Sequence, residues 1–306
     1  TATEGAVIRD KIKRALLKAA GRPFADEAAL DRFIDTELEF PLRSGYGGNT
    51  SSVEITGGDH YTLCDMGSGL RCFGQQVLAQ HGPGRPQVYD FFMSHVHWDH
   101  IMGFPFFRPI YRKETSIRMF GCPFTQDSVR KMISKVMTAP NFPVDFVDVQ
   151  ADITYQEACQ DSFAIKSLTV TPIVTSHPNP GIGYKLVEDG RCFVFLTDNE
   201  LSFKHPGGLD FKDYVEFSAQ ADLLIHDSEF TEEEYRDKKT WGHSTYEDAL
   251  RLALAARVKQ FGLFHHNQDR TDAAVEEIVG NCRRIIAGKG APLECFAVHE
   301  GLEIHL

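Results

Sequence analysis

The chain opens with apolar residues at helical spacing and then changes to short apolar runs. Val7, Ile8 and Ile12 repeat every three or four positions within residues 7–20, and residues 27–38 show the same pattern. From residue 50 onward, short apolar runs are interrupted by Gly and Asp, which is typical of strands and turns. We therefore expect two amphipathic helices ahead of a region that contains the strands.

Further helices alternate with the strand-like runs, and "EDGR" after Val187 predicts a hairpin turn. This alternation predicts an α/β fold whose sheets carry helices on their outer faces. The sequence has no internal repeat, low-complexity segment or long linker, so we expect a single domain over residues 1–306 with a helical segment at 1–40. Helical spacing marks the segments 75–80, 126–137, 246–256 and 272–286.

Composition narrows the function classes. The 306 residues are 42% hydrophobic, enough for a large core, and the formal net charge is −11. A chain this acidic lacks the basic surface that long nucleic-acid contacts require, so tRNA and long nucleic acid are poor expectations as partners. A small anion remains compatible with a metal site, because the metal supplies positive charge.

The cysteines and the N-terminus bear on location. Seven scattered cysteines without a CxxC pair predict reduced, mostly buried thiols and a cytoplasmic protein. No leader pattern and no run of about 18 apolar residues is present, so we expect no membrane segment. The chain begins with Thr1 rather than Met, which leaves room for residues ahead of it.

The stretch "SHVHWDH" concentrates metal-ligand chemistry in six residues. His95 and His97 are two apart at the end of a strand, so their side chains share a face. Asp99 and His100 follow where a turn brings them toward the same point. Imidazoles with a carboxylate suit zinc and similar divalent ions, and adjacent Asp99 and His100 diverge, so this set serves two ions more easily than one.

Three more donors stand at the ends of other apolar runs. His177 follows "LTVTPIVTS", Asp198 follows "RCFVFLT", and a pair of histidines ends "KQFGLFHH". Strand ends converge at one edge of a sheet, where α/β proteins place their sites. One of the two adjacent histidines must face away, and we favour His266 over His265 as the ligand.

Taken together, "SHVHWDH", His177, Asp198 and His266 resemble the metallo-β-lactamase superfamily. The resemblance implies a four-layer αβ/βα sandwich with two metal ions between its sheets. By it, one ion is held by His95, His97 and His177, the other by Asp99, His100 and His266, and Asp198 bridges them. Asp65, in "CDMGSG", is a candidate partner for a ligand histidine.

"LLIHDSEF", "WGHSTYEDAL" and "SHPNPGIGY" are similar to loops of the ribonuclease Z group within that superfamily. The similarity implies that His243 pairs with an acidic residue, Asp227, and assists departure of the leaving group. A cation beside a carboxylate is also a reasonable proton donor on chemical grounds. Alternatively, His243 is a neighbour of the N-cap of a helix that starts near Tyr246, with Ser244 or Thr245 as the cap.

Two features depart from ribonuclease Z. The tRNA-gripping arm of those enzymes lies between the positions of His177 and Asp198, where this chain has only 20 residues. Similar proteins begin with a strand and a "GxRGS"-like turn, which are not seen at the N-terminus of this chain. The helical segment found there is expected to cap the pocket, to form a homodimer interface or simply to pack as a helix pair. The missing arm and the acidic charge favour a small phosphodiester, such as a cyclic nucleotide, as substrate.

The predicted chemistry is hydrolysis by hydroxide bridging two divalent ions, with zinc first and manganese or iron as alternatives. Asp99 orients the nucleophile and His243 protonates the leaving oxygen. Two alternatives remain open: a lactone or thioester hydrolase using the same metals, and a non-hydrolytic metalloprotein of cofactor biosynthesis.

Overall fold

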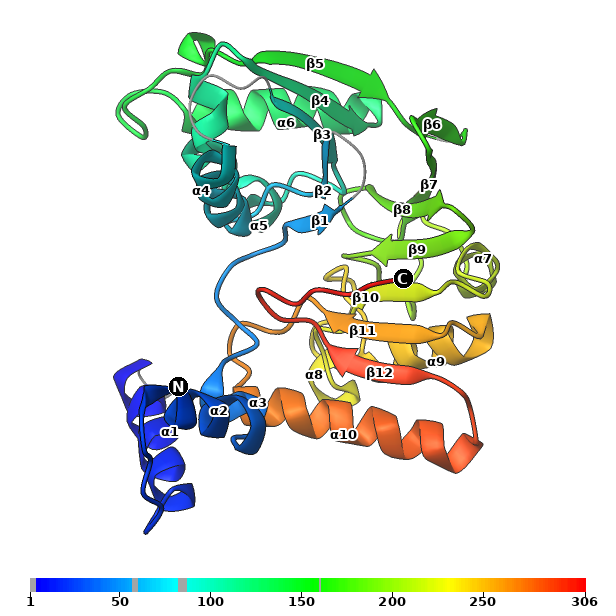
Figure 1. Cartoon of the computed structure of the whole chain (residues 1–306). Coiled ribbons are helices and arrows are strands. Elements are labelled where there is room, and N and C mark those ends of the chain that lie inside the picture. Colours follow the sequence, from blue (N-terminus) through cyan, green and yellow to red (C-terminus); the bar gives the residue numbers. More distant parts are fainter. Residues whose placement is uncertain (1–3, 57–59, 82–86, 160) are drawn as a thin grey trace.

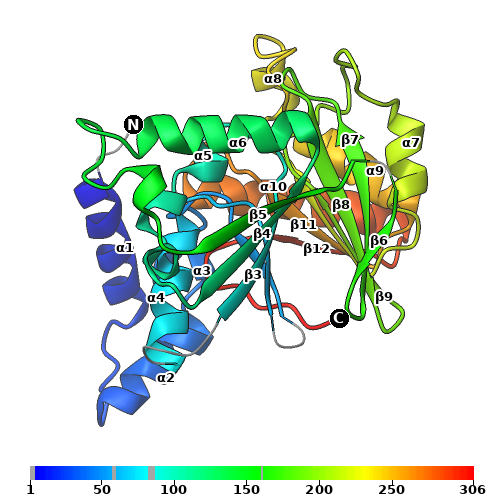
Figure 2. The ribbon, with the colours of Figure 1, turned by 90° about the horizontal axis from the view of Figure 1, so that it is seen from above.

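The computed structural model describes residues 4–56, 60–81, 87–159 and 161–306. Two sheets face each other, with helices on the outer side of each (Figures 1 and 2). This is the expected layer order, and the predicted α/β sandwich is confirmed.

The first sheet has the order β1-β2-β3-β4-β5. β1 pairs antiparallel with β2, and the other neighbours are parallel. Figure 2 shows α6 running across its outer face, and α4 lies on the same side against a cluster that includes Phe91 and Phe107. The elements are β1 (Val53–Ile55), β2 (Tyr61–Cys64), α4 (Gly69–His81), β3 (Gln87–Phe92), α5 (Trp98–Ile101), β4 (Thr115–Gly121), α6 (Pro123–Val136) and β5 (Asp152–Glu157).

The second sheet has the order β12-β11-β10-β9-β8-β7-β6. Its β6–β9 part is antiparallel and its β9–β12 part is parallel. Helices α7, α9 and α10 cover its outer face over a second cluster. The elements are β6 (Phe163–Ile165), β7 (Leu168–Thr175), β8 (Gly181–Glu188), β9 (Arg191–Leu196), α7 (Phe211–Phe217), β10 (Leu223–Asp227), α8 (Glu232–Tyr235), α9 (Tyr246–Ala256), β11 (Gln260–Phe264), α10 (Asp272–Lys289) and β12 (Glu294–Ala297).

A third apolar cluster fills the space between the sheets. Phe92 of β3, Tyr184 of β8 and Phe195 of β9 are fully buried there. Because both faces of β3 are covered, its sequence reads as an apolar run rather than an alternation. Burying each such aromatic side chain contributes roughly 1.5–3 kcal/mol, so this cluster holds the two sheets, and the groups at their edges, in fixed relation.

Asp90 is the charged residue within β3. It is fully buried, and Arg118 of β4 donates to both carboxylate oxygens at 2.5 and 2.6 Å. The pairing satisfies a charge that would otherwise be costly inside a sheet.

The N-terminal helical segment comprises α1 (Glu4–Lys18), α2 (Glu27–Glu37) and α3 (Phe40–Arg43), which Figure 1 shows gathered beside the start of α10. The two predicted helices are therefore present. Lys11 ties α1 to the body by donating to Asp272 at 2.6 Å and to the carbonyl of Ser44 at 2.7 Å. Much of the apolar face of α1 stays on the surface, with Leu17 74% exposed.

The later helices follow the sequence pattern closely. Helix α9 coincides with the predicted residues 246–256, and α10 extends the predicted 272–286 to Lys289, where Gly290 ends it at a φ of +61°. The predicted hairpin joins β8 to β9 through Asp189 and Gly190, both at positive φ, as a tight turn requires.

One sequence expectation about cysteine is wrong. Cys122 and Cys159 are joined as a disulfide, although all seven cysteines were expected to be reduced. They follow the paired strands β4 and β5, which bring Cα atoms 37 residues apart in sequence to within 4.8 Å. Among the described residues, the free cysteines are Cys64, Cys72, Cys192, Cys282 and Cys295.

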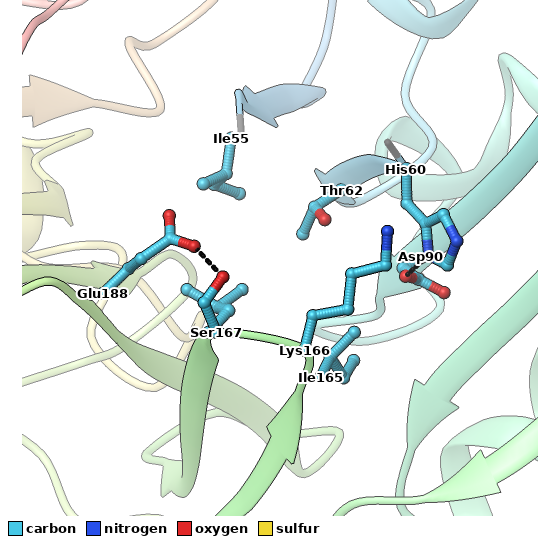
Figure 3. Close-up of a pocket in the computed structure, with 9 residues that line it drawn as sticks. Ile55, His60, Thr62, Asp90, Ile165, Lys166, Ser167 and Glu188 are labelled. Carbon is cyan, nitrogen blue, oxygen red and sulfur yellow. Dashed lines mark hydrogen bonds and ion pairs between the residues drawn. The ribbon is translucent and has the colours of Figure 1, made fainter. Parts of the chain in front are cut away.

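A cavity of about 30 Å³ lies at the start of β7, where Lys166 and Glu188 line it together with His60 (Figure 3). The predicted metal ligand His177 follows the other end of this eight-residue strand, roughly 25 Å away at 3.3 Å per residue. The cavity is therefore separate from the predicted site.

Within the described ranges, we find no helix with both the length and the apolar character needed to cross a bilayer.

Candidate metal centre

The predicted site residues follow strands that end at one edge of the two sheets. His95 comes three residues after β3, and His177 and Asp198 each come two residues after β7 and β9. His97 is the N-cap of α5, a single helical turn that carries Asp99 and His100 toward the same edge. Strand ends and one turn thus collect side chains that lie up to about 170 positions apart in the chain.

The first group of donors consists of three histidines and one aspartate. The ring centroids of His95, His97 and His177 lie 4.5–4.7 Å apart. Asp198 Oδ2 is 3.4 Å from Nε2 of His95 and 3.9 Å from Nε2 of His177. One donor atom from each of the four residues falls within 4.8 Å of the others, a spacing suited to a single ion.

The second group is richer in carboxylate. Asp99 Oδ2 lies 3.2 Å from Nε2 of both His100 and His265. Asp198 faces this group with its other oxygen, Oδ1, which is 3.2 Å from His100 Nε2 and 3.6 Å from His265 Nε2. Asp198 therefore presents one oxygen to each group, which is the arrangement of a bridging ligand.

The preference for His266 over His265 is wrong. His265 reaches the second group, whereas His266 Nε2 lies 3.0 Å from the carbonyl of Val298 and its ring packs edge-on against Tyr46. Burial lowers the pKa of His266 to about 4. The strand alternation used for the prediction does not apply, because β11 ends at Phe264 and His265 turns the chain at a φ of +56°.

Backbone strain recurs around the site. Asp65, Asp198 and His265 each follow a strand by one or two residues and each adopts a φ of +48° to +63°. For residues other than glycine this conformation is uncommon and is kept only where the surroundings enforce it. Each of the three turns its side chain to the edge where the donors meet.

Asp65 contacts the predicted ligand His100, as expected from the sequence. Its carboxylate accepts from the Ser94 backbone N–H at 2.8 Å, from Ser94 Oγ at 2.9 Å and from His100 Nδ1 at 2.8 Å. With Nδ1 protonated toward Asp65, His100 has its Nε2 lone pair available for a metal. Similarly, His177 Nδ1 donates to the backbone carbonyl of Asn179 at 2.8 Å.

The donor set fits a divalent cation. Nε2 of His95 and of His177 is buried and makes no hydrogen bond, a state that costs about 1–3 kcal/mol per group in a metal-free protein. Burial lowers the pKa of His95 well below its usual value and that of His177 to about 4, so both rings are neutral. His97 Nε2 is approached at 2.8 Å by the exposed amide of Asn179. Neutral imidazoles and carboxylates are the ligands that zinc and related ions take.

Charge balance differs in the second group. Burial lowers the pKa of His100 and His265, but the surrounding carboxylates outweigh it and raise both pKa values well above the usual value. Burial raises the pKa of Asp198 and Asp99, but the neighbouring imidazoles outweigh burial and hold the pKa of both carboxyls below their usual range. Without metal, protons on the histidines thus offset the negative charge that a cation would otherwise neutralise.

His243 and Asp227 lie at the rim of the donor groups. His243 Nδ1 donates to Asp227 Oδ2 at 2.7 Å. Burial would lower the pKa of His243, but Asp227 dominates and raises it to about 9. The predicted pair is therefore in contact. The capping alternative also holds, because Thr245 is the N-cap of α9 and accepts from the N–H of Asp248.

Glycine is required where the His243 loop passes the first group. Gly242 has a φ of +99°, and a Cβ there would lie 2.2 Å from Cδ2 of His177. The loop backbone thus touches a ring of the first donor group, which places His243 beside it, with ring centroids of His177 and His243 6.0 Å apart.

Comparison with known proteins agrees with this geometry. Residues 60–266 match the family model described as a beta-lactamase superfamily domain. The chain belongs to the metallo-β-lactamase superfamily. The chain is therefore a metal-dependent hydrolase with the fold of this superfamily.

Three similar proteins illustrate the range of names within the superfamily. A ribonuclease Z from Haloarcula marismortui is 25% identical to this chain, in an alignment that covers 83% of this chain and 90% of the relative. The structure of unliganded yeast PDE1 has a TM-score of 0.60 at 13% identity, covering 80% of this chain and 91% of that one. A diphosphatase from the PhnP family has a TM-score of 0.57 at 16% identity, covering 83% of each chain. The two structures support the fold alone.

Sequence reasoning missed two glutamates that organise this superfamily site. Glu200 is 1% exposed and accepts from the backbone N–H groups of Thr240 and Gly242 at 2.8 Å, from Tyr235 Oη at 2.5 Å and from His205 Nε2 at 2.7 Å. It therefore fixes the loop that carries His243. The acid two residues after Asp198 was a visible signal, but its partners lie up to 42 positions away. The other missed residue is Glu229, which contacts both His265 and His243.

Proposed function

We propose that this chain is a dinuclear metal-dependent phosphodiesterase that acts on a small phosphodiester, such as a cyclic nucleotide. The observation that carries the proposal is the pair of donor groups sharing Asp198, with the His243–Asp227 pair at their rim. Such a site can hold the two oxygens that change bonding at phosphorus and can also supply a proton.

Two divalent ions would be held by the two groups, with His95, His97 and His177 for one ion, Asp99, His100 and His265 for the other, and Asp198 between them. When bound, these ions would lower the pKa of water and offset the charge of the phosphodiester.

Asp99 is placed to orient the attacking water. Its side chain is 39% exposed, so it is accessible from the solvent side, while its Oδ2 is held between His100 and His265. A carboxylate in this position accepts a hydrogen bond from water and fixes the direction of attack.

His243 is placed to donate a proton to the leaving oxygen. Its Nδ1 is engaged by Asp227, which leaves Nε2 for the substrate. With a pKa of about 9 the ring is protonated at neutral pH, and Asp227 stabilises that charge. The pairing therefore keeps the acid both charged and oriented.

A small substrate is favoured over RNA by two features of the chain. Residues 178–197 form a short loop, β8, the Asp189–Gly190 turn and β9, which leaves no length for an arm. The formal net charge of −11 opposes a long polyanion. RNA remains the competing substrate, because curated relatives carry the name ribonuclease Z.

The test is a substrate panel on metal-loaded protein. It includes bis(p-nitrophenyl) phosphate, 2′,3′- and 3′,5′-cyclic nucleotides, a tRNA precursor with a 3′ trailer, and a lactone and a thioester for the carbonyl alternative. We expect the highest kcat/KM on a cyclic nucleotide and a loss of turnover in Asp99→Asn, whose zinc content is measured alongside. Preferential cleavage of the precursor would establish the RNA alternative, and a protein with two bound ions that hydrolyses none of the diesters would refute the proposal.

A further inference from the structure

Glu229 lies in the loop after β10 and contacts His265 of the second donor group through Nδ1, the ring nitrogen that does not face Asp99 and Asp198. Its Oε2 is 3.1 Å from Nδ1 of His265, and its Oε1 accepts from Asn267 Nδ2 at 3.2 Å. Its side chain is 17% exposed. A carboxylate oxygen can only accept here, so Nδ1 of His265 carries the proton and donates it to Glu229.

The backbone of Glu229 is held on both sides. Its N–H donates to Asp227 Oδ1 at 3.0 Å, and its carbonyl accepts from Arg270 at 2.7 Å. Arg270 is in turn paired with Glu234 at 2.6 Å and is itself 8% exposed. The carboxylate is therefore presented by a fixed loop rather than by a freely moving surface chain.

The placement of Glu229 has a direct consequence for His265. With Nδ1 engaged by Glu229, Nε2 of His265 faces Asp99 and Asp198, which lie 3.2 and 3.6 Å away, and its lone pair becomes available when a metal ion displaces the Nε2 proton. His100 has the corresponding partner in Asp65. His265 comes from a turn at positive φ, so its ring orientation depends on side-chain contacts more than on a regular strand.

We propose that Glu229 is a positioning residue for the second metal ion. It fixes the tautomer and the ring plane of His265 and raises the basicity of its Nε2, as carboxylate partners of ligand histidines do. The inference rests on the proposed metal centre, and it extends that centre to a residue outside the ligand set.

The same oxygen also lies near the proposed acid. Glu229 Oε2 is 3.5 Å from His243 Nδ1, and the rings of His243 and His265 stack at 4.8 Å with an interplanar angle of 22°. Asp227, at 2.7 Å, is the nearer partner of His243. We therefore expect loss of Glu229 to act first on metal binding at His265.

The experiment measures zinc affinity in the absence of substrate, by competition with a chromogenic chelator, and zinc content by mass spectrometry. Glu229→Ala is expected to weaken one of the two binding steps about 10- to 100-fold and to leave the other unchanged. Glu229→Gln keeps an accepting oxygen, so it should recover part of that affinity. Glu232→Ala is the matched control, because it removes an exposed carboxylate a few residues along the same segment and should bind both ions normally.

Folding is followed by circular dichroism and Tm on each variant, and Glu229→Gln carries the test if Glu229→Ala does not fold. Wild-type affinity for both ions in the folded variants would overturn the inference, as would an equal loss at both steps. A wild-type protein that binds fewer than two ions would overturn it together with the metal centre. A wild-type protein that binds two ions but hydrolyses no diester would refute the proposed function and leave this inference standing.

Discussion

The two donor groups can each hold a metal ion, but the pKa values of their histidines are shifted in opposite directions. In the first group, burial keeps His95 and His177 neutral, with their Nε2 lone pairs unpartnered. In the second, carboxylates surround His100 and His265 and raise their pKa values. Desolvation therefore keeps the histidines of the first group neutral and able to bind a metal ion. In the second group, protons on the histidines offset the charge of the carboxylates until a cation displaces those protons. Asp198 belongs to both groups and couples them.

Loss of the shared carboxylate should have the largest effect. Asp198→Ala removes one oxygen from each group, so we expect both ions to be lost. Turnover should fall by more than about 100-fold, because 100-fold is already the largest loss typical of removing a residue that only supports a metal ligand. Zinc content and kcat/KM measure both effects. Retention of one tightly bound ion would show that the groups are independent.

His265→Ala compared with His266→Ala separates the two adjacent histidines. Removing His265 should release the second ion and lower turnover about 100-fold, while the first ion stays bound. Removing His266 deletes only the contacts with Val298 and Tyr46, so we expect full metal content and a loss of about 1 kcal/mol in the free energy of unfolding. Zinc content and urea unfolding decide between them, and a reversed result would reinstate His266 as the ligand.

His243→Ala tests the rim of the site apart from both groups. Without the proton donor, kcat should fall about 100-fold with both ions retained, because His243 is not needed to hold them. The loss should be smaller for a substrate with a p-nitrophenolate leaving group, which needs little protonation, than for a cyclic nucleotide. Equal losses on both substrates would argue against a role in leaving-group departure.

Among the substitutions of residues in and around the donor groups, Glu200→Gln should lower turnover least. One amide group cannot accept all of the hydrogen bonds that the carboxylate receives, so the His243 loop should loosen. We expect a loss of about 1–3 kcal/mol in the free energy of unfolding and about a tenfold fall in kcat, with metal content unchanged. An unchanged kcat in a destabilised protein would limit Glu200 to a structural role.

Much of the fold could be predicted from the sequence, because the local sequence pattern of these elements favours the same conformation as their packing in the tertiary structure. Helices α9 and α10 carry clear 3.6-residue spacing and caps, and the β8–β9 turn has the Asp-Gly pair that positive φ favours. Helix α4 begins at Gly69, six residues before the predicted start, because a glycine-rich beginning gives no helical signal. The disulfide partners Cys122 and Cys159 carry no local signal, since their meeting depends on the pairing of β4 with β5.

The sequence by itself determined the type of chemistry, since "SHVHWDH" with His177 and Asp198 places metal-ligand side chains after three apolar runs, and the ends of such runs meet at one sheet edge. Only the tertiary structure decided that His265 rather than His266 faces the donors, because the strand ends one residue earlier and a positive φ resets the direction of the side chains. It alone also brought Glu200 and Glu229 to partners dozens of residues away, since hydrogen bonds between loops leave no periodic trace in the sequence.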